Sequence, residues 1–371
     1  MVVTDSAGTI IDVVEGQDAG DGIEVFQGML TPGFVNAHCH LELSHLKGMI
    51  PANTGLVSFV QQVMSNRACS AEQKQEAMMT ADAAMYAAGI VAVGDICNTA
   101  DSITVKNQSK IHWHNFVEVS GFVDAKAQQR LDEMKKVYDQ FQVANPGKGN
   151  TTFSPHAPYS VSKTLFQLLN DATAGQLITI HNQECAAENH LYQQKTGDFL
   201  SLYKNFGIDI SVFEPTGKTS FQSWLPMFSG AQSILAVHNT FIDIEDLTFF
   251  KNLSKPVEVY YCICINANKH IEQITPPLEL MMKHNCNMVI GTDSLASNYQ
   301  LDILEEIKAI QQETNLPLTE LLQWATLNGA RALQMEDKIG SFEKGKKPGI
   351  VLIEELTGLQ AGPQSFSRRI L

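Results

Sequence analysis

The sequence is poor in charged side chains. They make up 18% of its 371 residues, whereas about 25% is typical of soluble domains, so much of the chain must be interior. Lys and Arg number 26 against 40 Asp and Glu, which gives a formal net charge of −14. No lysine- or arginine-rich run could neutralise a phosphate backbone. We therefore expect neither nucleic acid nor a membrane surface as a partner.

Several informative patterns are also missing. The seven cysteines include no CxxC pair, which argues against a zinc finger or a dense disulfide framework. No run of about 18 uncharged apolar residues occurs, and the start, MVVTDSAGTIIDVVEG, does not resemble a signal peptide. GxGxxG and GxxxxGK[ST] are absent, so nucleotide phosphate binding has no local support. Together these absences predict a cytoplasmic protein.

Between residues 33 and 340, short β-branched or apolar runs alternate with amphipathic stretches of helical length. Strands are expected at 33–40, 91–97, 111–119, 151–156, 176–181, 233–238, 257–264 and 287–293. Helices are expected at 71–88, 128–141, 162–172, 186–205, 244–253, 277–284, 301–313 and 318–333. Eight such βα units predict an α/β fold, a closed (β/α)8 barrel of the TIM type over residues 32–340.

The two chain ends differ from the middle. Residues 2–26 and 349–353 are β-like with turn residues around them, and GSFEKGKKPG is a charged, glycine-rich exit from the last helix. We expect residues 1–31 and 341–371 to form one small composite domain, similar to a β-sandwich.

Metal-competent residues end several predicted strands, at the face where barrel enzymes carry their active sites. They are His38, His40, His156, His181, His238 and Asp293. Residues at i and i+2 of a strand point to one face, so His38 and His40 can converge on one ion. Singly, His181 and His238 could be buried structural histidines, and Asp293 a helix cap. Their joint placement predicts a metal site.

An HxH pair alone is a weak signal, and the chain contains its own comparison. His112 and His114 form a second HxH pair, in HWHN, early in the third predicted strand. Apolar residues follow it, so we expect this pair to pack or hydrogen-bond and not to bind metal.

At this point the residues resemble a known family. TPGFVNAHCHLE resembles the PGxxNxHxH opening of the amidohydrolase superfamily, ITIHNQE its HxxE element, LAVHNT its sixth-strand histidine and VIGTDS its GTD aspartate. SPHAPYSVS and CICINANKH are similar to segments of its deaminase branch, which acts on S-adenosylhomocysteine, methylthioadenosine and guanine. GTDSLASNYQLD is similar to the aminodeoxyfutalosine deaminases.

Two departures from that branch stand out. Ile265 and Ala267 replace the proline and serine of its CPxSN segment, so only Cys264 and Asn268 carry over. The chain also reaches His38 sooner than most relatives reach theirs. We therefore expect the small domain to lack strands, or an upstream segment to be missing from this sequence.

The resemblance implies His38, His40, His181 and Asp293 as metal ligands. Binuclear members carry a bridging lysine at the end of strand four, where this chain has SPHAPYS, so a single ion is expected. Imidazole and carboxylate ligands suit Zn²⁺, with Fe²⁺ as the alternative. Zinc lowers the pKa of its bound water toward about 7, which would provide hydroxide as the nucleophile.

By the same resemblance, this hydroxide would attack a ring carbon that bears an amino group, and ammonia would leave. Glu184 would protonate the adjacent ring nitrogen. Asp293 would accept the water proton and return it to the leaving group. His238 would hold or polarise the hydroxide.

Five residues are expected to contact the substrate. His156 matches the SPHAPY histidine, which faces the base in relatives, and Asn268 matches the asparagine of the CPxSN segment. Glu42 and His45 could reach ribose hydroxyls or an acyl tail. Because arginine is scarce, a carboxylate clamp on the substrate would depend on Arg67.

Three functions are compatible with these observations. The first is deamination of an adenine-bearing nucleoside or a related aminated heterocycle, of the S-adenosylhomocysteine, methylthioadenosine or aminodeoxyfutalosine type. The alternative is hydrolysis of a cyclic amide or a chlorotriazine, which begins with the same attack. The third is a non-catalytic scaffold, which would be expected to have lost a metal ligand. The expected partner is a small-molecule substrate, and relatives often form homodimers.

Overall fold

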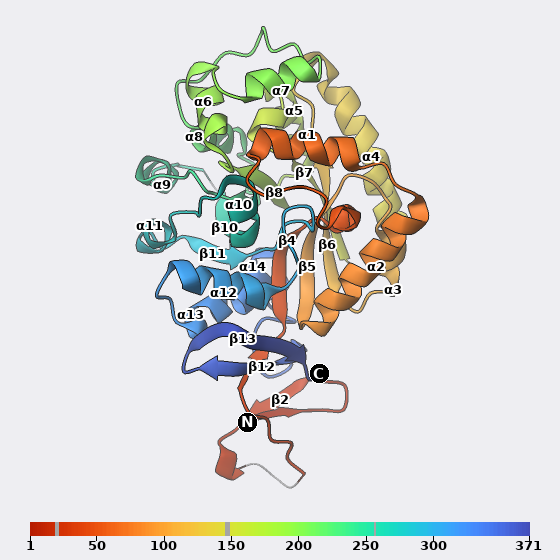
Figure 1. The fold of residues 1–371 in the computed structure, drawn as a ribbon, viewed down its shortest axis with the longest axis vertical. Coiled ribbons are helices and arrows are strands. Elements are labelled where there is room, and N and C mark those ends of the chain that lie inside the picture. Colours follow the sequence, from red (N-terminus) through yellow and green to blue (C-terminus); the bar gives the residue numbers. More distant parts are fainter. Residues whose placement is uncertain (19–21, 145–148, 256) are drawn as a thin grey trace.

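The computed structural model describes residues 1–18, 22–144, 149–255 and 257–371. Two four-stranded parallel sheets form its centre, in the orders β4-β5-β6-β7 and β11-β10-β9-β8 (Figure 1). Their strands are β4 Phe34–Cys39, β5 Ile90–Cys97, β6 His112–Val119, β7 Gly149–Pro155, β8 Leu177–Asn182, β9 Ser233–His238, β10 Glu258–Ile263 and β11 Asn287–Ile290. All eight predicted strands are therefore confirmed, and the fold is α/β.

The central strands are buried along nearly their whole length. Every residue of β4, β5 and β8 is buried, which is the pattern of parallel strands covered on both faces. This burial explains why the strands appear in the sequence as short, nearly continuous apolar runs.

Hydrogen bonds link the two sheets at both pairs of edges. Between β7 and β8, the backbone N–H of His181 donates to the carbonyl of His156 at 2.9 Å. After β11, the N–H groups of Thr292 and Asp293 donate to the carbonyl of His38 at 3.0 and 3.1 Å. The Asn36 side chain also donates to the Thr292 hydroxyl at 2.7 Å. These contacts bring the carboxyl ends of strands from both sheets together.

Helices follow most of the strands. They are α1 Leu56–Asn66, α2 Ala71–Ala87, α3 Ile103–Gln108, α4 Ala127–Ala144, α5 Lys163–Ala172, α6 Ala186–Gln194, α7 Phe199–Asn205, α8 Ser220–Trp224, α9 Ile244–Lys251, α10 Ile265–Glu272, α11 Leu278–Lys283, α12 Ile303–Glu313, α13 Leu318–Gln323 and α14 Gly329–Ala332. Within the described ranges, none of these helices combines the length and hydrophobicity needed to cross a membrane.

Two predicted helices are interrupted. The stretch 186–205 forms α6 and α7, because Lys195 adopts a left-handed conformation, with φ 53°, and ends α6. The stretch 318–333 is broken by a π-helical turn, Trp324–Asn328, between α13 and α14. Both breaks are local changes of backbone geometry that a hydrophobic period does not reveal.

Four helices are absent from the prediction: α1, α3, α8 and α10. For α1 the signal was present. Its buried residues Leu56, Phe59 and Val63 follow an i, i+3, i+7 spacing, which is typical of an amphipathic helix.

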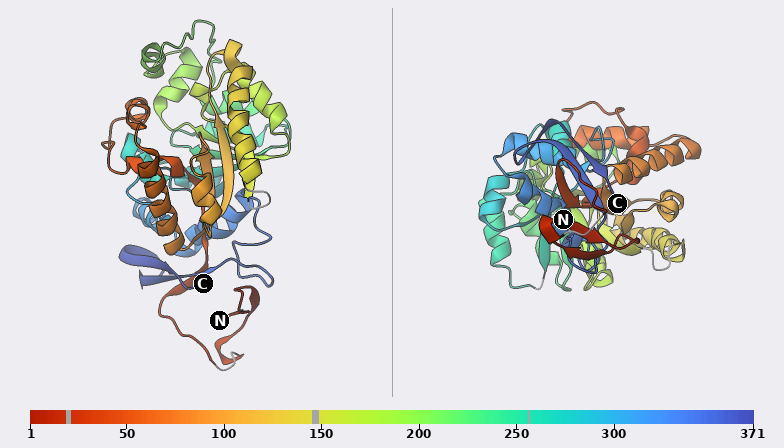
Figure 2. Two further views of the ribbon diagram at one scale, coloured as in Figure 1. Left: turned by 90° about the vertical axis from the view of Figure 1, so that its right-hand side faces the viewer. Right: turned by 90° about the horizontal axis from the view of Figure 1, so that it is seen from below.

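The chain termini lie together at one end of the molecule (Figures 1 and 2). β1 Val2–Thr4 and β2 Ile10–Val13 form a hairpin, and β3 Met29–Pro32, β12 Ile350–Thr357 and β13 Gln360–Arg369 form an antiparallel sheet in the order β13-β12-β3. The sheet therefore joins the two chain ends through β3, which lies outside the predicted β-like segment 2–26, and the predicted segment 349–353 stopped before β13. Residues 19–21 of the predicted β-like segment lie outside the described residues.

A buried ion pair supports the chain beside the first histidines. The Lys106 ammonium of α3 lies 2.5 Å from the Asp95 carboxylate of β5, and both side chains are almost fully buried. The second oxygen of Asp95 accepts the backbone N–H of Leu41 at 2.8 Å. Since Leu41 follows His40 directly, the pair fixes the backbone at the end of β4. A buried pair of this kind costs desolvation, and its retention fits a positioning role.

Candidate active site

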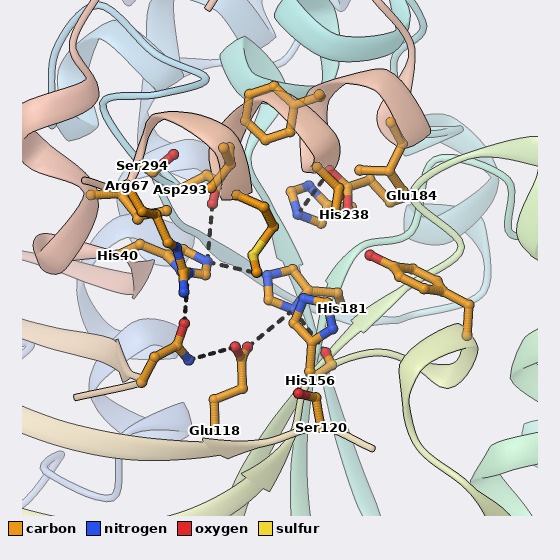
Figure 3. A pocket seen from close by; sticks show the side chains of 18 of the residues that line it. His40, Arg67, Glu118, Ser120, His156, His181, Glu184, His238, Asp293 and Ser294 are labelled. Carbon is orange, nitrogen blue, oxygen red and sulfur yellow. Dashed lines mark hydrogen bonds and ion pairs between the residues drawn. The ribbon is translucent and has the colours of Figure 1, made fainter. Parts of the chain in front are cut away.

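Four of the predicted site residues meet at the carboxyl ends of the strands, and Figure 3 shows three of them, His40, His181 and Asp293. The Nε2 atom of His40 lies 3.1 Å from Nε2 of His38 and 3.2 Å from Nε2 of His181. Oδ1 of Asp293 lies 3.3 Å from Nε2 of His40 and 3.5 Å from Nε2 of His38. The side chains predicted to bind metal are therefore brought together from β4, β8 and the end of β11.

The protonation state of His181 suits a metal ligand. Its Nδ1 lies 2.8 Å from the carbonyl oxygen of His156. Because a carbonyl only accepts hydrogen bonds, Nδ1 must carry the hydrogen, which leaves a lone pair on Nε2. Burial, together with nearby histidines, lowers the pKa of His181 to about 3, so the ring is neutral at physiological pH.

The spacing of the four donors also fits an ion. Burial lowers the pKa of His40 well below its usual range. Burial alone would raise the pKa of Asp293, but the hydrogen bond from His38 and the influence of neighbouring histidines hold it well below its usual value. Zinc–nitrogen bonds of about 2.0–2.1 Å correspond to roughly 3.3 Å between neighbouring ligands of a tetrahedron. The three imidazoles and the carboxylate could therefore hold a divalent metal.

His238 lies next to this quartet. One nitrogen of His238 lies within 4.8 Å of ligand atoms of His38, His181 and Asp293, so His238 could replace His40 in the ligand set. Burial lowers its pKa to about 4. Its Nε2 lies 3.5 Å from Oε1 of Glu184.

Glu184 is a buried carboxyl beside the cluster. It follows β8 and is 4% exposed. Burial, followed by repulsion from Asp293 and other carboxylates, raises its pKa well above the ordinary value. The raised pKa favours the protonated form of Glu184, which has a proton to donate.

The backbone is strained at two of these positions. His238 and Asp293 have φ values of 73° and 57°. These values lie in the left-handed region of backbone conformation, which residues other than glycine rarely adopt. Gly291, in the GTD segment, has no room for a side chain, since a Cβ there would lie 2.9 Å from Cβ of His38. Strain of this kind concentrates at functional sites, because the surrounding contacts have to hold it.

A cavity of about 340 Å³ opens over the cluster. Leu56, Phe59, Val60 and Val63 of α1 contribute an apolar wall, while the histidines, Glu184 and Asp293 line the polar end. The helix that the sequence analysis overlooked therefore covers the site. An aromatic or heterocyclic ligand suits such a lining.

Two of the five residues predicted to contact the substrate line the cavity, and three do not. His156 and Arg67 line the cavity. His156 Nδ1 lies 2.6 Å from the Ser160 hydroxyl, and burial, followed by the charge of Arg67, lowers the pKa of His156 to about 4. The backbone carbonyl of His156 also orients the His181 ring. This role was not predicted, because it does not depend on the His156 side chain.

Among the described residues, Glu42, His45 and Asn268 are not part of the cavity lining. The Glu42 carboxylate accepts the backbone N–H of Thr99 at 3.0 Å and so holds the loop after β5. His45 Nδ1 lies 3.1 Å from the carbonyl oxygen of Glu42 in its own helical turn. The Asn268 amide donates to the Thr240 hydroxyl. These three positions support neighbouring segments in the structure, and direct substrate contact stays a prediction.

The second HxH pair lies apart from the cluster. His114 is buried, and its Nε2 lies 3.1 Å from the Thr152 hydroxyl. His112 is exposed at the start of β6. His114 therefore packs and hydrogen-bonds as expected, whereas His112 is exposed and does not pack in the interior.

Glu118 was missed by the sequence analysis. It lies near the carboxyl end of β6, is 8% exposed and lines the cavity. Its position at a strand end was the available signal, but only the histidines of this strand were considered.

A pH-dependent stability is expected from Glu188, which supports the loop after β8. Its carboxylate accepts the backbone N–H of Gln183 at 2.8 Å, and burial raises its pKa to about 7. A carboxyl whose pKa is higher in the folded state contributes stability below its unfolded pKa and loses that contribution as pH rises through the folded value. Between about pH 5 and pH 9, wild type should lose about 3 kcal/mol of unfolding free energy relative to Glu188→Gln.

Urea denaturation of both proteins at the two pH values measures this difference. The exposed Glu279→Gln variant serves as the control and should follow wild type. An equal fall in wild type and Glu188→Gln would contradict the expected role of Glu188.

Comparisons with known proteins identify the family and relatives of this chain. The model of the Amidohydrolase family matches residues 29–365. An adenosine deaminase of Helicobacter pylori is 26% identical over 327 residues, which cover 86% of this chain and 77% of that protein. A 5-methylthioadenosine/S-adenosylhomocysteine deaminase of Thermoanaerobacter pseudethanolicus is 29% identical over 345 residues, which cover 87% and 73% of the two chains.

A solved structure has the same fold. The aminofutalosine deaminase of Helicobacter pylori, in complex with methylthio-coformycin, superimposes with a TM-score of 0.78 at 23% identity. The alignment covers 96% of this chain and 88% of that chain.

Proposed function

The chain belongs to the Amidohydrolase family, and from this premise we propose that it is a metal-dependent hydrolase that deaminates an adenine-bearing nucleoside or a related aminated heterocycle. The observation that carries the proposal is the convergence of three imidazoles and the Asp293 carboxylate beside the buried Glu184 carboxyl, at the end of one cavity. The deaminase activities named for the relatives support it.

One divalent ion would be held by His38, His40, His181 and Asp293, with Zn²⁺ favoured by the ligand types and Fe²⁺ as the alternative. When bound, such an ion supplies a water molecule with a pKa lowered toward about 7, and hence a nucleophile at neutral pH. The His156 carbonyl keeps the hydrogen of His181 on Nδ1, so that Nε2 stays available to the ion.

The remaining steps are assigned to side chains of the protein. Glu184 donates its proton to the ring nitrogen next to the carbon that is attacked, which neutralises the charge that develops there. Its neighbour His238, at 3.5 Å, orients the nucleophile. Asp293 accepts the proton of the nucleophile and passes it to the amino group, which leaves as ammonia when its bond to the ring carbon breaks. The Ser297 hydroxyl, which donates to Oδ2 of Asp293, fixes the orientation of that carboxylate.

For the substrate, we assign His156 to the base and Arg67 to the outer part of the cavity. Glu42, His45 and Asn268 would act through the segments that they support. The apolar wall of α1 excludes water from the reacting carbon and packs against the heterocycle.

We also propose that the two sheets close into a (β/α)8 barrel. The hydrogen bonds between β7 and β8, and between β4 and the end of β11, support closure at both seams. Residues 1–31 and 341–371 would then form the composite domain, with β12 between β3 and β13. A homodimer remains an expectation from the family.

A panel of substrates tests the activity. Zinc-loaded protein is incubated with adenosine, methylthioadenosine, S-adenosylhomocysteine and 5′-deoxyadenosine, and both ammonia and the ultraviolet difference spectrum are recorded. Ammonia release with a matching spectral change is expected for at least one of them. Turnover of a cyclic amide or a chlorotriazine, with no ammonia from any aminated heterocycle, would replace the proposal by the alternative hydrolysis.

A further inference from the structure

The Glu118 carboxylate has one oxygen with a hydrogen-bond partner and one without. Oε2 accepts a hydrogen bond from the Asn98 amide at 2.7 Å. Oε1 is buried, and the described residues offer it no hydrogen-bond partner. A buried acceptor without a partner is costly in a folded protein, so its presence in a cavity wall points to a ligand.

The orientation of this carboxylate is fixed by a chain of side chains (Figure 3). The Arg67 guanidinium donates to Oδ1 of Asn98 at 2.8 Å. Because Arg67 only donates, the Asn98 amide group must present its NH₂ to Glu118. Residues from the end of α1, the loop after β5 and the end of β6 thus fix the Glu118 carboxylate in the cavity wall, where Oε1 has no partner.

The nearest ring does not satisfy this oxygen. Oε1 of Glu118 lies 3.8 Å from Nδ1 of His181, but that nitrogen already gives its hydrogen to the His156 carbonyl at 2.8 Å. The same hydrogen bond argues against a second metal among Glu118, His156 and His181, whose ligand atoms lie within 4.8 Å of one another. A nitrogen that carries a hydrogen has no lone pair to offer.

The position of Glu118 indicates which part of a ligand it meets. It lies on the Nδ1 side of His181, whereas the metal-competent cluster lies on the Nε2 side. In Figure 3, Glu118 and Glu184 lie on opposite sides of His181. The reacting ring carbon belongs beside Glu184, so Glu118 faces a different part of the substrate.

We propose that Oε1 of Glu118 is a specificity-determining acceptor for a sugar hydroxyl of the substrate. This inference rests on the proposed nucleoside deamination. A nucleoside carries its hydroxyl donors away from the amino-bearing carbon, and a carboxylate is a strong acceptor for them. The site therefore selects ribonucleosides over free bases and over nucleosides that lack the hydroxyl.

Kinetics on matched substrates tests this role. Wild type, Glu118→Gln and the exposed control Glu279→Gln are compared on the best adenine nucleoside and on its 2′-deoxy, 3′-deoxy and dideoxy analogues. Glu118→Gln should raise KM for the parent nucleoside about 10- to 100-fold, with kcat and metal content nearly unchanged. For the analogue that lacks the hydroxyl bound by Glu118, KM should already be raised in wild type, and Glu118→Gln should not raise it further.

An equal rise in KM for every analogue, or loss of metal in Glu118→Gln, would overturn the inference. So would turnover restricted to sugar-free heterocycles, although deamination itself would then stand. If no nucleoside is turned over, the proposed function fails, and calorimetric binding of inosine and dideoxyinosine to wild type and Glu118→Gln still decides the role of Glu118. Tighter binding of inosine by wild type alone supports it, and equal binding in all four pairs refutes it.

Discussion

Replacement of His181 or Asp293 by alanine is expected to abolish metal retention. Each residue contributes a donor atom within 3.5 Å of at least one other donor in the cluster. Removing a residue that hydrogen-bonds to a metal ligand typically lowers metal affinity about 10- to 100-fold. Removing the ligand itself should therefore lower metal affinity more than about 100-fold. Elemental analysis of desalted protein measures the effect.

His112→Ala is the matched control, because it removes a histidine of an HxH pair that lies apart from the cluster. It should keep its metal. Equal loss from this variant would refute the distinction between the two pairs. His40→Ala and His238→Ala separate the two ligand sets that the geometry allows, since only the true ligand should lose the ion.

Glu184→Gln is expected to have the largest effect on catalysis with the metal site intact. The amide keeps the shape of the side chain but does not transfer a proton, and such a loss typically costs about 10²- to 10⁴-fold in kcat. Burial raises the pKa of Glu184 well above its usual range. Since the protonated form is the proton donor, activity should fall as pH rises through this raised pKa.

The measurement is kcat/KM against pH on the best substrate, together with metal content. Glu188→Gln is a suitable control, because it removes another buried carboxyl with a raised pKa that lies outside the cavity lining. It should retain most of the activity at pH 6. Full activity of Glu184→Gln, or an unchanged alkaline limb in its pH profile, would exclude a proton-donating role.

Much of the fold was predictable because its signals are local. The strands are short apolar runs, and all eight were found within a few residues of their observed ends. The broken helix at 186–205 and the π-helical turn after Gln323 were not found, since they depend on single backbone conformations. β13 was missed because it is half exposed and lies beyond the last apolar run of the sequence.

The same division applies to the candidate site. The i, i+2 spacing of His38 and His40 and the strand-end positions of His181 and Asp293 are properties of the sequence, and parallel strands bring such ends together. The sequence also contained the carboxyl of Glu184, whereas the exposed position of His112 was seen only in the structure. Their chemical roles remain predictions that the variants above test.

Only the tertiary structure decided which atoms face one another. The His156 carbonyl that sets the tautomer of His181 comes from a residue 25 positions away in the chain. The orientation of the Glu118 carboxylate is fixed by Asn98 and Arg67, which come from two other segments of the chain. The burial of a side chain, the pKa of its ionisable group and its hydrogen-bond partners all depend on residues that are distant in the sequence. Strand periodicity, in contrast, depends only on residues that are close in the sequence.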